Sequence, residues 1–256
     1  MNKKVQKIRL GVNVDHVATL RNARGTVYPD PLQMALILEH LGVDGITAHL
    51  REDRRHILDE DIVNLVREVN LPVNLEMAAT MEMQSIALEL VPHAVCLVPE
   101  RREERTTEGG LDVIAEEKKL KEFITPLLER NIRVSIFVSA ELKQIDAACR
   151  IGAPVVELNT GSFCDFFCDN KFDHYSKELK KLRVGAHHAE QLGLEVHGGH
   201  GLSYDTVKFI AGIPEIRELN IGHFLISQAI FDGISIAISK MRSEIDLAQN
   251  SYMGSQ

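Results

Sequence analysis

The stretch Asp44-Gly45-Ile46-Thr47-Ala48-His49-Leu50-Arg51 joins a short apolar run, typical of a buried strand, to titratable and charged side chains. Side chains alternate between the two faces of an extended strand, so Thr47, His49 and Arg51 are expected to share one surface. The charged residues 52–55 alone are typical of a solvated loop. An imidazole and a guanidinium at the end of a buried strand instead predict a functional site.

The same arrangement recurs along the chain. Short β-branched runs alternate with longer segments of helical period, which indicates repeated βα units and a parallel sheet. Strands are predicted at 8–14, 44–50, 72–76, 94–98, 133–138, 154–158, 194–197 and 216–221. Helices are predicted at 31–42, 59–69, 81–90, 111–130, 141–151, 173–192, 206–211 and from 224 onward, with an irregular insert at 163–172.

About eight such units in 256 residues predict an α/β fold of the (β/α)8 barrel type. An open doubly wound sheet is the alternative, but no Gly-x-Gly-x-x-Gly turn follows the first strand. We expect one barrel domain over residues 1–247 and a disordered tail over 248–256.

Composition narrows the class of partner. A net charge of -8 argues against nucleic acid, because binding to a phosphate backbone needs a dominant basic face. No stretch reaches the roughly 18 apolar residues of a membrane helix, and an acid follows the basic start too early for a signal peptide. The four cysteines lack the spacing of a zinc site or disulfide scaffold, and reduced surface thiols are predicted for Cys164 and Cys168. We therefore expect a cytoplasmic protein.

Polar residues gather where the predicted strands end, and in a barrel of this type that end carries the active site. They are Asn13, Asp15, His16, His49, Arg51, Glu76, Glu100, Glu157, Asn159, Thr160, His197, His200, Asn220 and His223. The many imidazoles and carboxylates favour general acid–base catalysis. No lysine falls at a strand end, which argues against an enzyme-bound Schiff base.

Two glycine-bearing turns, at 198–202 and 221–223, follow the last two strands and predict a phosphate site, because small residues let backbone N–H groups approach an anion. Arginines could hold a second anionic group. The candidates are Arg21, Arg24, Arg51 and Arg54. Two such sites predict two phosphorylated substrates or one bisphosphate.

Two other functions stay open. A metal-dependent hydrolase could use ligands from the set His16, His49, Glu76, Glu157 and His200. Against it, the first strand carries no His-x-His pair and Arg51 beside His49 would repel a cation. A non-catalytic phosphosugar-binding protein is the second alternative, although it would not need His49 and Glu76 together.

Several ungapped motifs closely resemble the pyridoxine 5'-phosphate synthase family. They lie at 11–25, 49–56, 74–78, 97–100, 106–112, 199–202 and 218–223, in order over nearly the whole chain. The chain departs from the family pattern at Asn159, where histidine is expected, and at His197, where asparagine is more frequent. The insert at 163–172, with two cysteines, is also unfamiliar.

The resemblance implies a (β/α)8 barrel with additional helices that acts in vitamin B6 biosynthesis as an enzyme of the transferase class. It condenses 3-amino-2-oxopropyl phosphate with 1-deoxy-D-xylulose 5-phosphate, closes the pyridine ring, and releases phosphate and water. It further implies a homo-octamer built from dimers, with no metal and no organic cofactor. The loop 100–110 is expected to act as a lid.

Carried over by motif, the resemblance also implies the roles of individual residues. His49 and Glu76 would accept protons, His200 would donate one, and Glu157 would stabilise a charged transition state. The amino-ketone phosphate would be bound by Asn13, Arg24, Gly201, Gly222 and His223. The deoxyxylulose phosphate would be bound by Asp15, His16, Arg51, His56 and Thr106.

Overall fold

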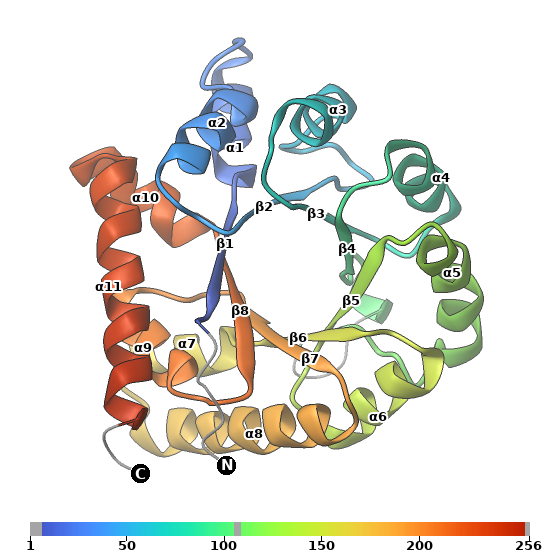
Figure 1. Ribbon diagram of the computed structural model, residues 1–256, viewed down its shortest axis with the longest axis vertical. Coiled ribbons are helices and arrows are strands. Elements are labelled where there is room, and N and C mark those ends of the chain that lie inside the picture. The colour runs from blue at the N-terminus through green and yellow to red at the C-terminus, as the bar shows by residue number, and fades with distance from the viewer. Residues whose placement is uncertain (1–6, 105–108, 254–256) are drawn as a thin grey trace.

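Eight parallel strands close into a barrel with helices around it (Figure 1). The computed structural model describes residues 7–104 and 109–253. Each strand pairs with the next in sequence, and β1 closes the ring by pairing with β8. The strands are β1 (Arg9–Asn13), β2 (Gly45–His49), β3 (Val73–Met77), β4 (Ala94–Leu97), β5 (Arg133–Val138), β6 (Val155–Asn159), β7 (Glu195–Gly199) and β8 (Ile216–Ile221). The predicted (β/α)8 barrel is confirmed.

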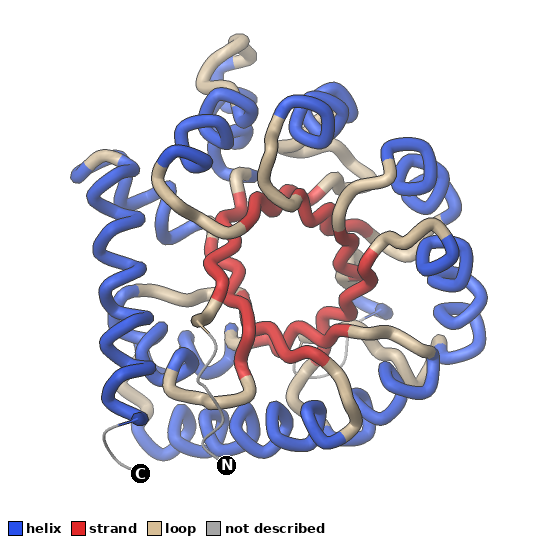
Figure 2. Tube along the Cα trace, viewed as in Figure 1, coloured by secondary structure: helices blue, strands red, loops and turns tan. Residues whose placement is uncertain are grey.

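The helices form an outer ring around the strands (Figure 2). They are α1 (Asp15–Arg24), α2 (Pro31–His40), α3 (Asp59–Glu68), α4 (Met81–Leu90), α5 (Glu117–Glu129), α6 (Leu142–Ile151), α7 (Gly161–Cys168), α8 (Phe172–Gln191), α9 (Tyr204–Ala211), α10 (His223–Asp232) and α11 (Ile234–Met253), with a short 3₁₀ turn η1 (Arg102–Glu104). Among the described residues no helix is both long enough and apolar enough to cross a membrane.

Local signals explain several helix ends. Asp30 caps α2 by accepting a hydrogen bond from the backbone N–H of Leu32, and Pro31 occupies the first helical turn, where its missing N–H costs nothing. At the other end of a helix, Gly152 adopts a left-handed conformation with φ 91° and stops α6. Of these signals, the prediction used only the proline at the start of α2; it placed the end of that helix at residue 42, whereas α2 ends at His40.

The predicted irregular insert at 163–172 is wrong, because residues 161–168 form helix α7. Its Phe163 is buried and contacts the rings of Phe167, Tyr175 and Phe209. Cys164 is also buried, so the prediction of surface thiols fails for this cysteine. A tertiary aromatic cluster, rather than a helical period in the sequence, stabilises α7.

The tail beyond Leu247 also differs from the prediction, because α11 continues through Met253. Ala248 packs against the hydrophobic core, and the Gln249 side chain accepts a hydrogen bond from the backbone N–H of Ile8. Arg242 of the same helix pairs with Asp44 and donates to the backbone carbonyl of Ile8. Contacts with the start of the barrel thus extend the helix past the predicted end.

Successive side chains along each strand face two environments, the apolar core outside the barrel and the barrel interior. Leu10, Val12 and Leu219 face outward and belong to the apolar core between the strands and helices. The inward positions carry polar side chains instead, and they include the buried residues Thr47 and Asn220. Because a buried polar group must find a partner, this interior depends on hydrogen bonds rather than on apolar packing.

Candidate active site

His49 ends β2 and lies between two carboxylates. Its Nε2 is 3.0 Å from Glu100 Oε1, and its Nδ1 is 4.0 Å from Glu76 Oε2. A carboxylate cannot donate when it is ionised, so Nε2 carries the proton toward Glu100. This arrangement leaves Nδ1 as the basic nitrogen on the side of Glu76.

Asn13 joins two acids at the end of β1. Its Nδ2 donates to Asp15 Oδ2 at 3.0 Å and lies 3.3 Å from Glu76 Oε2, while its Oδ1 accepts from the backbone N–H of Asp15. Asp15 Oδ1 in turn accepts from the backbone N–H of His49 at 2.8 Å. The first three strands therefore bring a base and two acids to one point.

Both acids hold their protons more strongly than ordinary carboxyl groups do. Burial raises the pKa of Asp15 to about 6, against the opposing effect of the His49 N–H. Burial also raises the pKa of Glu76 well above its usual range, and the nearby charges of Asp15 and Glu157 raise it further. Carboxyl groups of this kind can exchange protons near neutral pH, which suits general acid–base chemistry.

Glu157 lies inside the barrel on β6, and its residue is only 3% exposed. Asn220 Nδ2 of β8 donates to Glu157 Oε2 at 2.7 Å. Burial raises the pKa of Glu157 to about 7, the Asn220 hydrogen bond lowers it, and the charge of Glu218 raises it. The carboxyl group can thus be charged or neutral within the physiological range.

His200 follows β7 in a left-handed conformation with φ 78°. Thr160 donates to the His200 carbonyl at 2.6 Å, and Phe137 lies edge-on to the His200 ring with centroids 6.3 Å apart. A Cβ at Gly161 would lie 2.7 Å from His200 Cδ2, so the start of α7 sets the position of this imidazole. Strain of this kind in a non-glycine residue is typical of functional sites.

The turn after β8 presents the N-terminus of α10, where unpaired N–H groups favour an anion. A Cβ at Gly222 would lie 2.7 Å from Asn13 Cβ, so only glycine lets the two turns approach this closely. His223 stacks edge-on against His16 with ring centroids 4.8 Å apart. Burial and the neighbouring His223 both lower the pKa of His16, which favours the neutral form of that ring.

Arg51 and His56 lie near His49. Arg51 pairs with Glu100 at 3.7 Å and with Asp53 at 3.4 Å, and the His56 ring lies 6.0 Å from the His49 ring. Burial, together with the charges of His49 and Arg51, lowers the pKa of His56 to about 4.

Other predicted binding residues lie apart from this group. Arg24 is exposed in the last turn of α1 and makes no ion pair with another described residue. Thr106 lies outside the described residues. Arg21 is not available for a substrate, because it is buried and forms two hydrogen bonds with Asp61, at 2.6 and 2.7 Å.

Glu100 has a structural role that neither the motifs nor the family resemblance assigns. Besides contacting His49 and Arg51, it accepts from the backbone N–H of Glu52 at 3.1 Å. Burial raises its pKa, but the hydrogen bond and charge of His49 together hold that pKa below the usual value. Its position after a buried strand places it among the polar residues predicted for the active-site end, but that position does not predict its contact with His49.

Two groups of side chains could hold a cation among the described residues. Asp15, His49 and Glu76 bring their ligand atoms within 4.8 Å of one another, and Glu195, His197 and Glu218 do the same. Asp15, His49 and Glu76 are also the groups suited to acid–base chemistry. Their side chains alone therefore fit either metal binding or acid–base catalysis.

Comparison with known proteins identifies the family of the chain. Residues 10–247 match the family model described as pyridoxal phosphate biosynthesis protein PdxJ. A pyridoxine 5'-phosphate synthase of Cereibacter sphaeroides is 58% identical over 96% of this chain and 98% of its own length. The protein of that name from Roseobacter denitrificans is 61% identical over 95% of this chain and 98% of its own length.

Solved structures show the fold alone. The phosphoribosyl anthranilate isomerase of Thermus thermophilus matches with a TM-score of 0.59 at 11% identity, over 94% of this chain and all of its own. A sequence match over nearly the full length, with more than half of the residues identical, is far more specific. The chain belongs to the family of pyridoxal phosphate biosynthesis protein PdxJ.

Proposed function

We propose that this protein is a pyridoxine 5'-phosphate synthase, which condenses 3-amino-2-oxopropyl phosphate with 1-deoxy-D-xylulose 5-phosphate and closes the pyridine ring. One observation supports this chemistry most directly. His49 lies between Glu76 and Glu100, beside the acid Asp15, at the C-terminal end of the barrel. These groups follow separate strands and meet at one end of the barrel, and His49 and Glu100 are largely buried there instead of forming a surface ion pair.

The proposed reaction suits these groups. The amine of one substrate attacks the ketone of the other, so the imine forms between the substrates and no enzyme lysine is needed. Enolisation, phosphate loss, ring closure and dehydration then each require a proton to move. We assign proton acceptance to His49 and Glu76, proton donation to His200, and stabilisation of positive charge to Glu157.

Anion binding is divided between two sides of the site. The N-terminus of α10, with Gly222 and His223, and the adjacent Asn13 would hold the amino-ketone phosphate, with help from Gly201 and Arg24. Arg51, His56 and His16, with Asp15 and Thr106, would hold the deoxyxylulose phosphate. Fixing both substrates supplies the orientation that a bimolecular condensation lacks.

We also propose, on the family resemblance, a cytoplasmic homo-octamer built from dimers, with one barrel domain over residues 1–247. Light scattering on the purified protein tests the subunit number. A single species of lower mass would contradict the octamer without affecting the proposed reaction.

Turnover by the metal-free protein tests the reaction. Both phosphorylated substrates are mixed with it, and pyridoxine 5'-phosphate and released phosphate are followed together. We expect product formation that persists in chelator and collapses in His49→Ala. Phosphate release without the pyridine product would refute the proposal.

A metal-dependent hydrolase remains the second candidate, because Asp15, His49 and Glu76 could also bind a cation. This candidate predicts activity only after a divalent metal is added, and loss of that activity in chelator.

A further inference from the structure

A chain of polar side chains extends from Glu157 toward the N-terminal end of the barrel. Asn220 Nδ2, which donates to Glu157, also lies 3.5 Å from Glu218 Oε1. That same oxygen is 3.4 Å from His197 Nδ1, and His197 Nε2 is 2.8 Å from Glu195 Oε1. Neither the motifs nor the proposed reaction assigns a role to Asn220, Glu218 or Glu195.

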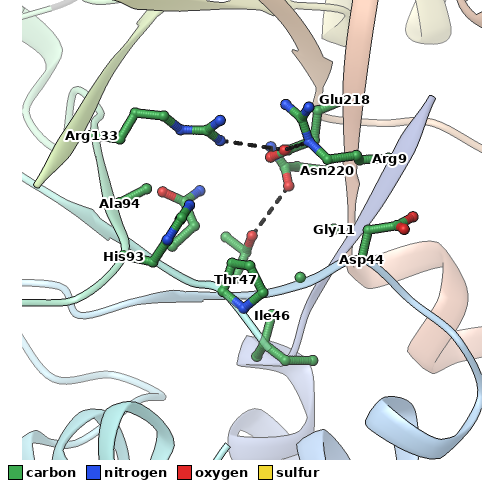
Figure 3. A pocket seen from close by; sticks show the side chains of 13 residues that line it. Arg9, Gly11, Asp44, Ile46, Thr47, His93, Ala94, Arg133, Glu218 and Asn220 are labelled. Carbon is green, nitrogen blue, oxygen red and sulfur yellow. Dashed lines mark hydrogen bonds and ion pairs between the residues drawn. The ribbon is translucent and has the colours of Figure 1, made fainter. Parts of the chain in front are cut away.

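The orientation of the Asn220 amide is determined by its neighbours. Thr47 Oγ1 donates to Asn220 Oδ1 at 3.2 Å, and Figure 3 shows this bond. With its oxygen held by Thr47, the amide must turn its NH₂ group toward Glu157 and Glu218. A flipped amide would place its oxygen against two carboxylates.

Two glycines make room for this pair of side chains. A Cβ at Gly11 would overlap Asn220 Oδ1, and a Cβ at Gly199 would overlap Glu157 Oε1. Any larger residue at either position would displace the amide or the carboxylate. The space inside the barrel is therefore shaped to hold Asn220 against Glu157.

Arg9 and Arg133, at the N-terminal end of the barrel, favour the charged form of Glu218. It faces a cavity of about 210 Å³ at the N-terminal end of the barrel, which Arg9 and Arg133 also line (Figure 3). Arg9 Nε donates to Glu218 Oε2 at 2.7 Å, and Arg133 lies 3.4 Å from the same oxygen. Burial raises the pKa of Glu218, but His197 and Arg9 together bring it below its usual value.

We propose that Asn220, locked by Thr47, is a positioning residue for Glu157, and that the Glu218–His197 pair beneath it controls how readily Glu157 carries a negative charge. The inference rests on the proposed function, in which Glu157 must be ionised to stabilise positive charge. It adds to that function two residues, Asn220 and Glu218, that act on the reaction through Glu157 and not by touching substrate.

Other titratable groups face Glu157 as well. Across the barrel these are Glu76 of β3 and the Cys96 thiol of β4, and burial raises the pKa of both. The charge of Glu218 on β8 raises the pKa of Glu157, and Glu218 pairs with His197 on β7, the strand next to β6. Removing the Asn220 donor should therefore raise the pH at which Glu157 ionises, whereas neutralising Glu218 should lower it.

The pH dependence of kcat in two variants tests this inference. In Asn220→Ala the midpoint of the acidic limb should rise by about 0.5 to 1 pH unit, and in Glu218→Gln it should fall by a similar amount. A merely structural role would lower kcat in both variants without moving the midpoints in opposite directions. Unmoved midpoints, or shifts of the same sign, would overturn the inference.

Thr47 provides a second test that leaves the ion pairs of Glu218 in place. Thr47→Val keeps the shape but removes the donor to Asn220, so the acidic midpoint should rise as in Asn220→Ala, and Thr47→Ser should restore it. Glu215→Gln is the matched control, because Glu215 pairs with His187 outside the barrel and should leave the midpoint unchanged. An equal shift in Thr47→Ser and Thr47→Val would contradict the positioning role.

An infrared titration separates failure of the inference from failure of the proposed function. The carboxylic C=O band that disappears in Glu157→Gln is assigned to Glu157 and followed against pH in each variant. This readout needs no turnover. If the wild-type protein forms no pyridine product, the proposed function fails, and the band still shows whether Asn220 and Glu218 act on Glu157 in opposite directions.

Discussion

The proposed role of His49 as a base depends on Glu100, because the 3.0 Å contact holds the Nε2 proton and leaves Nδ1 free to accept another. The two residues are far apart in the sequence and meet only because β2 and β4 both end at the same side of the barrel. Motif reasoning predicts His49 as a strand-end base. It does not predict its partner, because that contact is set by the closure of the barrel.

Substitution of His49 tests its proposed role as a base most directly. We expect His49→Gln to reduce kcat by about 10² to 10⁴ and to change substrate affinity little, since general base catalysis is typically of this size. Single-turnover kinetics and equilibrium binding measure the two effects separately. A loss of affinity that accounts for the whole effect would place His49 in binding and not in proton transfer.

Arg21 is the residue for which sequence reasoning fails most clearly. A basic residue next to the Asn13-Val14-Asp15-His16 motif is a reasonable anion ligand, yet it is buried and paired with Asp61 of α3. Nothing local in the sequence distinguishes it from Arg24, three residues later and exposed. Only the packing of α1 against its neighbours separates a structural arginine from an available one.

Among the elements, the strands agree best with prediction. β5 and β8 have the predicted bounds, because short β-branched runs between turn residues leave little choice. The helices α1 and α7 were not predicted. Their residues show no clear period, and α7 is stabilised by aromatic contacts with α8 and α9.

The start of α7 carries a prediction about His200. Gly161→Ala would push its Cβ against the His200 ring, so we expect kcat to fall about 10-fold or more while KM changes less, because orientation of catalytic groups is lost before binding. Steady-state kinetics measure the split. Ser162→Ala, one position along the same helix, is the control and should behave as the wild-type protein; equal losses in both variants would contradict this account.

Helix α11 contributes stability through its inner face. Met241 is fully buried there, whereas Leu247 of the same helix is 61% exposed. We expect Met241→Ala to lower the free energy of unfolding by about 2 to 5 kcal/mol. Leu247→Ala should change it by about 0.5 kcal/mol or less. Urea denaturation compares them, and similar values for both would mean that α11 does not pack as described.

At the scale of the whole molecule, the barrel interior is polar where apolar packing is usual. Glu157, Glu218, His197 and Asn220 are all buried there. The eight-strand count predicts the barrel and the period of two predicts which residues face inward. The hydrogen-bonded network itself needs the register between strands, which a single sequence does not contain.

This interior makes stability depend on pH. The pKa of Glu157 is about 7 in the fold against an ordinary value of 4.5, so the folded state binds the proton more tightly and loses stability as pH rises through 7. One pKa unit corresponds to about 1.4 kcal/mol. Glu157→Gln removes the free-energy cost of ionising a buried carboxyl group at pH 8. We expect the variant to be more stable than the wild-type protein by about 2 to 3 kcal/mol at pH 8 and by little at pH 5. Urea denaturation at both pH values measures the difference.

The expected gain in stability is accompanied by a loss of activity, because the same variant removes the charge proposed for catalysis. A stability change of equal size at pH 5 and pH 8 would contradict the assignment, since it would reflect packing and not ionisation.

The hydrogen bond between the backbone N–H of Ile8 and Gln249 has a consequence for the connectivity of the chain. It brings the beginning of β1 and the last turns of α11 together beside the N-terminal end of the barrel. A short linker could therefore join them without disturbing any strand pair. A circular permutant opened at the exposed turn around Gly193, between α8 and β7, would keep the same eight-strand ring and leave the catalytic end untouched.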